Sequence, residues 1–406
     1  MNEQSGTILA TEEPVVFDPF VPGFTANPYP LLHRLRERDP VHRSPQGFWV
    51  LTRYDDVAAV LRNFRLFGAG NIRESLRSRY GAGAAFAYVS RRMNLFDPPD
   101  HTRLRSLVTR AFTARRVEAM RPHIQAIADK LLDAVGNARR MDVIAALAHP
   151  LPSLVICEML GVPEAERPQL SIWTSDVQLM LGPVTTPERL AAGEAAAAEF
   201  MEYIRVLEQE RRGNPSDDLL SALVAAEEGG GRLTEDELVA TILFLFSAGH
   251  STTRDLVGNG LLALLRHPDQ WHRLVADPSL IPVAVEECLR YDAPVTMFPR
   301  TALEDTTIRG TPIAAGEQAW VSINAANRDP ARFANPDRFD LDRPDNEHLA
   351  FGGGIHYCLG AGLARVEAQI IFGTLLRRYP HLELAEENIG WRAGFFRGPV
   401  ALHVSW

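Results

Sequence analysis

The stretch Phe-Gly-Gly-Gly-Ile-His-Tyr-Cys-Leu-Gly, residues 351–360, places one cysteine inside a glycine-rich turn. Consecutive glycines allow the backbone to visit positive φ and to approach a flat ligand closely. The residues that follow have helical composition, so we expect a helix over Leu359–Arg378 with Cys358 near its N-terminus. Free amide N–H groups and the helix dipole favour an anionic sulfur at such a position.

A thiolate held in this way can be the axial ligand of a haem iron. The alternative is a structural cysteine buried beside a turn, which is the commoner interpretation of a lone cysteine. Here Phe351, Gly354, Cys358 and Gly360 match every fixed position of the pattern F-x-x-G-x-x-x-C-x-G. The segment therefore resembles the haem-binding loop of a cytochrome P-450. The resemblance implies haem b as the cofactor, Cys358 as the iron ligand, and Phe351, Gly352 and Gly360 as residues that line the haem.

The composition is that of an ordinary globular protein, with 46% hydrophobic and 23% charged residues among 406. A net charge of −9 argues against nucleic-acid binding. The three cysteines show no C-x-x-C spacing, so neither a disulfide framework nor a zinc site is indicated. Residues 1–14 lack the apolar core of a signal peptide, and no apolar run reaches the roughly 18 residues of a membrane span. We expect a soluble, cytoplasmic protein without membrane attachment.

Hydrophobic periodicity is mainly helical from residue 100 to residue 264, with strand signals near residues 41–52 and 294–318. The longest helical pattern, Thr234–Leu265, opens with a capping box formed by Thr234 and Glu237. Residues 64–95 have no stable period and are predicted to form a long loop with short helices at most. We predict a flexible segment over 1–14 and one domain over 15–406, mainly α with small β-sheets. The resemblance implies the triangular prism of the cytochrome P-450 fold.

A second signal is Glu287-Cys288-Leu289-Arg290, in which Glu287 and Arg290 share a helix face at i,i+3. Alone such a pair means little, because surface ion pairs are common and weak. Some fifty residues later, the stretch Pro336–Phe339 includes Arg338. In cytochromes P-450 a glutamate and two arginines from such segments form a buried triad behind the haem loop. The resemblance implies this structural role for Glu287, Arg290 and Arg338.

Four basic side chains are candidates for holding the haem propionates, because buried carboxylates need cationic or N–H donors. His101 and Arg105 are one helical turn apart on a predicted helix. Arg300 follows Pro299, and His356 lies two residues before Cys358. By resemblance all four bind the propionates.

The polar hexapeptide Ala248–Thr253 interrupts an apolar helix, and buried hydroxyl groups must find partners there. Gly249 removes side-chain bulk where a small ligand must fit, and Thr252 can bond to an i−4 carbonyl or to oxygen at the haem. The family usually reads A-G-x-[DE]-T-T at this place. The resemblance assigns Ala248, Gly249, Ser251 and Thr252 to the oxygen side of the haem.

Ser251 stands where the family usually has an acid that helps to relay protons. A serine can pass a proton along but is not a carboxylate that titrates. Three interpretations follow. Water or substrate supplies the relay and the reaction is ordinary hydroxylation, which we favour. His250 replaces the acid, since imidazole titrates near neutral pH. Or the enzyme performs an atypical oxidation such as desaturation or ring coupling.

The resemblance implies O2-dependent hydroxylation or epoxidation of an apolar or amphiphilic small molecule, in secondary-metabolite biosynthesis. No flavin or nicotinamide domain is evident, so electrons are expected from a ferredoxin with ferredoxin reductase and NAD(P)H. A monomer is expected. The basic cluster that would face an acidic ferredoxin comprises Arg103, Arg105, Arg110, Arg115 and Arg116. The alternatives are a non-catalytic haem sensor, which Thr252 disfavours, and a peroxide-driven enzyme, disfavoured because the helix lacks an arginine near Ser247.

By resemblance an apolar substrate pocket is expected to be lined by Met93, Leu179, Leu243, Val295, Met297, Phe298, Phe395 and Phe396. Basic residues in the 64–95 segment suggest a substrate with a carboxylate or one linked to a carrier, although solvated arginines are the commoner interpretation. They are Arg73, Arg77, Arg79, Arg91 and Arg92.

Overall fold

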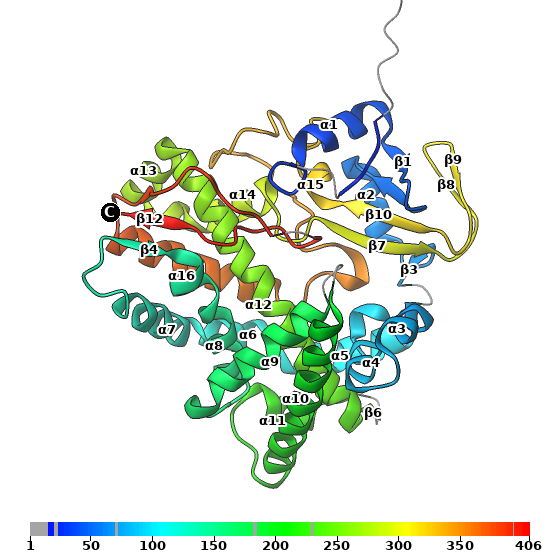
Figure 1. Ribbon diagram of the computed structural model, residues 1–406, viewed down its shortest axis with the longest axis vertical. Coiled ribbons are helices and arrows are strands. Elements are labelled where there is room, and N and C mark those ends of the chain that lie inside the picture. The colour runs from blue at the N-terminus through cyan, green and yellow to red at the C-terminus, as the bar shows by residue number, and fades with distance from the viewer. Residues whose placement is uncertain (1–14, 20–22, 70–71, 182–184, 229–230, 393) are drawn as a thin grey trace, which may run out of the picture.

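The computed structural model describes residues 15–406 apart from 20–22, 70–71, 182–184, 229–230 and 393. The predicted flexible segment 1–14 therefore lies outside the described residues, as does the side chain of Arg73. Helices make up most of the described chain and the sheets are small, which confirms the mainly α class (Figure 1).

The first hundred residues alternate short helices and strands. The strands indicated near residues 41–52 are present and form a hairpin, with β1 (Val41–Arg43) antiparallel to β2 (Trp49–Leu51). It is flanked by α1 (Tyr29–Arg38) and α2 (Tyr54–Arg62). The segment predicted to be a long loop holds more regular structure than expected: β3 (Phe67–Gly68), α3 (Ile72–Tyr80), α4 (Ala84–Val89) and the 3-10 turn η1 (Met93–Leu95).

Helices dominate the middle of the chain, and several of the breaks between them contain glycine or proline, such as Gly136, Gly161 and Pro215. One of the breaks contains β4 (Arg140–Asp142) and the π-helical turn η2 (Ile144–Ala148). The helices are α5 (Asp100–Ala111), α6 (Ala114–Ala119), α7 (Arg121–Asp133), α8 (Pro150–Met159), α9 (Arg167–Met180), α10 (Pro187–Gly213), α11 (Leu219–Ala225), α12 (Glu235–Arg266), α13 (Pro268–Ala276) and α14 (Ile281–Tyr291).

The main sheet has the strand order β1-β2-β10-β7-β3. Strand β7 (Met297–Ala302) runs antiparallel to β10 (Gln318–Ser322), which is parallel to β2. The sheet therefore joins the C-terminal third to the N-terminal hairpin. The remaining strands form smaller sheets: β5 (Glu227–Glu228) with β6 (Gly231–Arg232), β8 (Thr306–Ile308) with β9 (Thr311–Ile313), and β11 (Glu383–Leu384) with β12 (His403–Ser405) and β4.

Helix α12 runs through the centre of the molecule (Figure 1). Its predicted capping box is present: Thr234 Oγ1 accepts from the Glu237 N–H at 3.2 Å, and Glu237 accepts from the Thr234 N–H at 2.9 Å. Helix α16 (Ala361–Arg378) packs against α12, α14 and α7. Among the described residues, no helix has both the length and the apolar composition needed to cross a bilayer.

The core lies mainly around α12 and α16, whose buried apolar faces join one large hydrophobic cluster. A second, smaller cluster lies between α1 and the main sheet and contains Phe17, Leu32, Leu35, Val50, Met297 and Ala325. Short segments α15 (Ile323–Ala326) and η5 (Gly354–His356) connect the sheet to α16.

Candidate active site

Cys358 lies on a loop that folds back on itself before α16. Its backbone N–H donates to the Phe351 carbonyl at 3.0 Å, and the Tyr357 N–H donates to the Gly354 carbonyl at 3.2 Å. Gly354 has φ +62°, and a Cβ at this residue would lie 2.5 Å from the carbonyl oxygen of Leu61. Only glycine satisfies both conditions without strain. The loop therefore lies close against the C-terminal end of α2, and α16 begins at Ala361, two residues later than predicted.

Cys358 is exposed, yet enough protein surrounds its thiol for burial to dominate its pKa. Burial raises the pKa of this thiol, while the Gly360 N–H and the guanidinium groups of Arg105 and Arg365 act in the opposite direction. A metal ion removes the proton of a coordinating thiol outright. The raised pKa of the free thiol is therefore compatible with a thiolate that binds iron.

An ion pair behind the loop fixes its orientation. Arg365 of α16 donates to both oxygens of Glu286 at 2.7 and 2.8 Å, and its Cζ lies 4.5 Å from the centre of the Phe351 ring. Burial acts to raise the pKa of Glu286, but hydrogen bonds from Arg365 and His348 lower it to about 2. Sequence reasoning missed this contact, since only the following residue, Glu287, belongs to the recognised pattern.

The predicted pair of Glu287 and Arg290 is completely buried. Arg290 donates to Glu287 Oε2 and Oε1 at 2.8 Å, and both side chains are 0% exposed. The prediction that Arg338 completes this triad is wrong, because its side chain is 65% exposed and pairs only loosely with Asp340. Arg343 takes that place, with Nε 3.1 Å from Glu287 Oε2 and a side chain that is 5% exposed.

The physical reason lies in the turn between these two arginines. The backbone carbonyl of Arg338 accepts hydrogen bonds from Arg290 and Arg343, so its side chain points outward. The Asp340 N–H donates to Glu287 Oε1 at 2.8 Å. The chain therefore contributes the backbone at residue 338 and the guanidinium group at residue 343.

The four predicted propionate ligands gather beside the cysteine loop. The rings of His101 and His356 lie 4.2 Å apart, and Arg105 donates to the Tyr357 carbonyl at 2.8 Å. Burial and the charges of Arg300, His101 and Arg105 together lower the pKa of His356 to about 3. Burial likewise lowers the pKa of His101 and of Arg300.

This cluster has more donors than acceptors. Asp97 is the one carboxylate that acts on His101 and Arg300 in the described chain. His101 Nδ1 is buried without a hydrogen-bond partner among the described residues. Bound carboxylates would offset these costs of burial. The residues present therefore fit the two propionates of a haem.

Helix α12 has an open strip of residues opposite its packed faces. Ala248 is exposed and Thr252 is partly exposed, whereas Ser251 and Thr253 are buried. Thr252 Oγ1 donates to the Ala248 carbonyl at 2.7 Å, the i−4 bond that the sequence allowed. Phe244, one turn before Ala248, continues the strip and is partly buried.

Two residues of the polar hexapeptide face neighbouring helices instead. A Cβ at Gly249 would lie 2.7 Å from Ile156 Cδ1, so this glycine permits close packing of α12 against α8 and does not make room for a ligand. His250 Nε2 donates to the His149 carbonyl at 2.9 Å, and its Nδ1 lies 3.4 Å from Gln178 Nε2. Burial lowers the pKa of His250 to about 4, so its ring is neutral near pH 7. The two hydrogen-bonding contacts direct the ring at α8 and α9.

The sequence model of the family described as Cytochrome P450 matches residues 41–390. The chain belongs to the cytochrome P450 family. It is 41% identical over 407 residues to "Polyketide biosynthesis cytochrome P450 PksS" of Bacillus subtilis (strain 168), covering 97% of this chain and 99% of that one. As the family implies, it is a monooxygenase that uses haem.

Two solved cytochromes P450 share the fold. The structure of P450BioI in complex with hexadec-9Z-enoic acid ligated acyl carrier protein has a TM-score of 0.86 and 38% identity, covering 94% of this chain and 99% of that chain. The myxobacterial CYP267B1 in complex with myristic acid has a TM-score of 0.86 and 42% identity, covering 95% and 98%. These likenesses confirm the cytochrome P450 fold.

The predicted substrate pocket is only partly assembled. Val295 and Phe396 form an antiparallel bridge and both keep accessible surface. Phe298 lies near Gly352 of the cysteine loop. Met297 and Phe395 instead belong to the smaller cluster beneath the main sheet, which corrects the prediction for both. Successive side chains on β7 point to opposite faces, so Met297 and Phe298 cannot line one pocket.

Three further residues that were predicted to line the pocket lie elsewhere in the structure. Leu243 is 2% exposed and belongs to the main core, because it is one residue off the open strip of α12. Phe244, the next residue, lies on the open strip instead of Leu243. Met93 is also buried in the main core, and Leu179 is exposed on α9.

A buried carboxyl group that sequence reasoning missed lies between α16 and α12 of this cytochrome P450. Burial raises the pKa of Glu367 to about 8, although a hydrogen bond with Thr253 opposes the shift. Its Oε2 has no partner among the described residues. The sequence did offer a signal: Glu367 falls on the apolar face that Leu363, Val366 and Ile370 form on α16.

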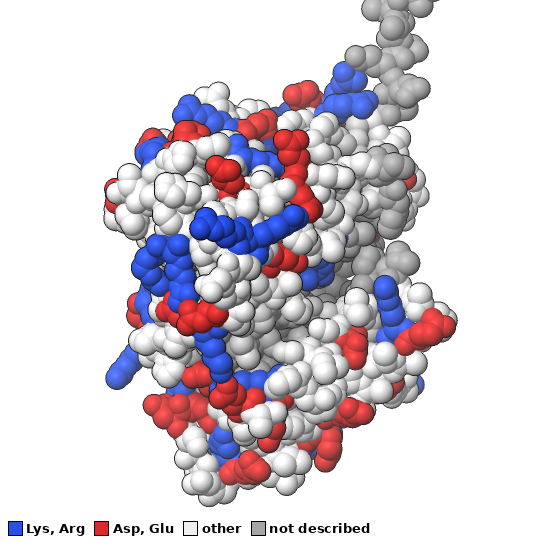
Figure 2. All heavy atoms as spheres, turned by 60° about the vertical axis from the view of Figure 1, so that its left-hand side comes forward, with Lys and Arg blue, Asp and Glu red and all other residues white. Residues whose placement is uncertain are grey.

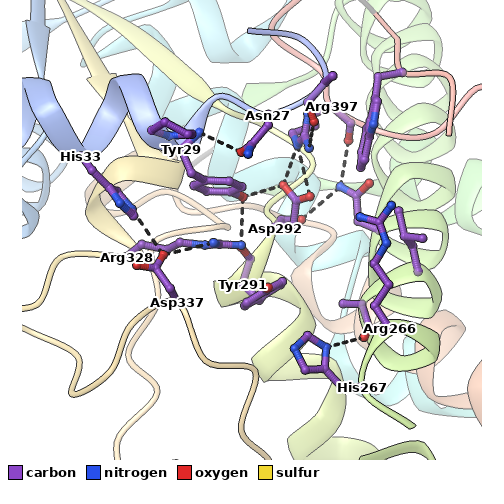
Figure 3. A pocket seen from close by; sticks show the side chains of 16 residues that line it. Asn27, Tyr29, His33, Arg266, His267, Tyr291, Asp292, Arg328, Asp337 and Arg397 are labelled. Carbon is purple, nitrogen blue, oxygen red and sulfur yellow. Dashed lines mark hydrogen bonds and ion pairs between the residues drawn. The ribbon is translucent and has the colours of Figure 1, made fainter. Parts of the chain in front are cut away.

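A hollow of about 580 Å³ lies at the far end of α12 from its capping box (Figure 3). Its charged groups bind one another. Arg397 Nε lies 2.8 Å from Asp292 Oδ1, and Arg328 Nη1 lies 3.2 Å from Asp337 Oδ1. The Arg328 guanidinium also stacks 3.4 Å from the centre of the Tyr29 ring. These contacts join the start of α1 to the C-terminal part of the chain.

Proposed function

We propose that this cytochrome P450 binds haem b through Cys358 and hydroxylates or epoxidises an apolar or amphiphilic molecule in secondary metabolism. One observation carries the proposal. The chain brings an exposed cysteine together with four basic residues on which only one described carboxylate, Asp97, acts. That combination fits an iron porphyrin with two propionates better than it fits a buried structural thiol.

Each group in the site then has a task. His101, Arg105, Arg300 and His356 hold the propionates, and Cys358 holds the iron. When bound, the haem supplies the redox chemistry of oxygen activation. The loop that carries Cys358 is fixed from behind by Arg365 and by the Glu287 network, so the position of the sulfur is set before haem binds.

Thr252 is the residue proposed to hold a proton on the oxygen side. Its hydroxyl donates to the Ala248 carbonyl and can rotate to donate toward the open strip. Ser251 is buried beside it and does not titrate. His250 is unsuited to a relay because both ring nitrogens face α8 and α9. Water or substrate is therefore proposed to complete the path, which leaves ordinary hydroxylation as the reaction.

Electrons are proposed to come from a ferredoxin with ferredoxin reductase and NAD(P)H. The exposed Arg115 on α6 supports docking near the cysteine loop, because α6 packs against α16. Other members of the predicted basic cluster are engaged within the protein: Arg103 binds Glu237 and Arg105 contacts the Tyr357 carbonyl.

Turnover with ferredoxin, reductase and NADPH tests the proposal. Candidate substrates are amphiphilic lipids and polyketides, because the relative PksS is named for polyketide biosynthesis and P450BioI was solved with a fatty acyl group. We expect a product that carries one oxygen atom from isotopically labelled O2. Substrates that shift the haem spectrum but yield no NADPH-dependent product would contradict a catalytic role and would favour a haem sensor.

A further inference from the structure

We propose that Arg92 binds the carboxylate of a long-chain organic acid and thereby selects both the substrate and the carbon that is oxidised. This inference rests on the proposed function and adds the substrate class to it. Arg92 lies between α4 and η1, in the segment predicted to be a long loop.

Arg92 lies beside the N-terminal end of the open strip. Its Cζ is 6.0 Å from the centre of the Phe244 ring on α12 and 5.8 Å from that of Tyr88 on α4. Tyr88 is completely buried, and its hydroxyl lies 2.6 Å from Ser247 Oγ. Ser247 is the residue before Ala248 of the open strip. The rings of Tyr88 and Phe244 therefore place the guanidinium group of Arg92 beside α12.

The positive charge of Arg92 is not matched by a described carboxylate within ion-pair distance. Its Nε is buried and lacks a hydrogen-bond partner among the described residues. The preceding residue shows the opposite case: Arg91 Nη2 lies 2.9 Å from Asp236 and its Nη1 donates to the Ala87 carbonyl. A half-buried guanidinium group among aromatic rings is costly to desolvate, and a bound anion offsets that cost.

The geometry of α12 sets where the substrate would be oxidised. Phe244, Ala248 and Thr252 are four residues apart, so they lie along one face of the helix. The rise of 1.5 Å per residue places Phe244 about 12 Å from Thr252 along the axis. A carboxylate held at Arg92 is therefore about two helical turns from the oxygen-side threonine. The oxidised carbon must then lie many bonds from the carboxyl group, in the second half of a long chain.

A long-chain acid is also the chemistry that two solved relatives display. CYP267B1 was solved with myristic acid, and P450BioI was solved with a fatty acyl group on its carrier protein. The two differ in one respect that matters here. A free acid presents a carboxylate, whereas an acyl group linked to a carrier has lost it and brings instead the phosphate of the carrier arm. An unmatched guanidinium group at this depth fits the free carboxylate.

Spin-state titration of the holoenzyme with myristic acid and with its methyl ester tests the assignment. We expect Arg92→Gln to weaken binding of the acid roughly 10- to 100-fold, the range of a hydrogen-bonded charge pair, and to leave the ester unchanged. Arg91→Gln is the matched control, since it removes the same charge one residue away, and we expect it to change neither affinity more than about twofold.

Several results would overturn the inference. These are failure of the wild type to bind the acid, equal loss of acid and ester in Arg92→Gln, and hydroxylation at the carbons next to the carboxyl. If Arg92→Gln weakens binding of a myristoyl carrier protein as much as binding of the free acid, Arg92 binds the carrier arm instead. If the wild type oxygenates the ester or another neutral compound but does not bind the acid, this inference fails and the proposed function stands. Loss of all turnover would remove the proposed function.

Discussion

At the scale of single residues, Thr252 and Ser251 occupy the positions at which the family usually has a threonine and an acid that relay protons. Thr252 borders the open strip and Ser251 is buried. We expect Thr252→Ala to lower the fraction of NADPH recovered as product roughly tenfold, because an oriented hydroxyl is lost. Ser251→Ala should have a smaller effect. Product analysis against NADPH consumption measures both, and unchanged coupling in the two variants would remove the relay from α12.

Glu367 predicts a particular pH dependence of stability. Its pKa is about 8 in the native state, above the ordinary value of 4.5, so the native state keeps a proton that the unfolded chain releases. This contribution is complete at low pH and is lost as pH rises toward about 8, at up to about 1.4 kcal/mol per unit.

The isosteric variant Glu367→Gln lacks this dependence. We expect it to match the wild type near pH 5 and to be more stable near pH 8, as measured by the unfolding midpoint of the holoenzyme. A stability difference that stays constant between the two pH values would show that Glu367 is ionised in the native state.

Some residue assignments were within reach of the sequence and others were not. Counting back four residues at a time from Thr252 gives Ala248 and Phe244, so helical periodicity alone would have replaced Leu243 by Phe244. Gly249 could not be assigned in this way, because a glycine that makes room for a ligand and one that allows α8 to approach look alike in sequence.

At the scale of elements, the buried network around Glu287 connects α14 to the turn before the cysteine loop. Removing one partner of a buried ion pair leaves an uncompensated charge, which typically costs about 3–5 kcal/mol. We expect Arg343→Ala to destabilise the protein by about that much and to weaken haem retention. Arg338→Ala, whose side chain is exposed, should change stability by less than about 0.5 kcal/mol. Chemical denaturation compares the two, and the reverse order would restore the original triad.

Elements with strong local signals were predicted well. The capping box marks the start of α12, and the strand signal over residues 41–52 indicates β1 and β2. The choice between Arg338 and Arg343 had no such basis, because both lie in a polar turn without periodicity and only the tertiary fold decides which side chain is buried. Helix α3 lies in the segment predicted to hold short helices at most, and Ile72, Leu76 and Tyr80, spaced four residues apart, were the apolar signal for it.

At the scale of the whole molecule, electron entry depends on charges around the cysteine loop. Acidic and basic side chains are interspersed over the face shown in Figure 2. Arg115→Gln should lower ferredoxin-supported turnover a few-fold at low salt, and the difference should vanish at high salt.

Arg266→Gln is the matched control for this experiment. Arg266 is exposed at the C-terminal end of α12, about 21 Å along the helix from Thr252. It should leave the ferredoxin-supported rate unchanged. Equal losses in the two variants, or a rate that salt does not alter, would argue against docking beside α6.

The mainly α fold, the family and the cysteine loop followed from sequence, because the loop pattern is local. The set of residues that line the substrate pocket did not follow from sequence, because it depends on which faces of β7 and α12 meet. The spectrum of the reduced, CO-bound protein tests most directly whether Cys358 of this loop binds the haem iron. We predict a Soret band at the position of a thiolate-ligated haem, which is lost in Cys358→Ala. A band at the position of an imidazole-ligated haem, or an unchanged spectrum with full haem retention in Cys358→Ala, would contradict the assignment.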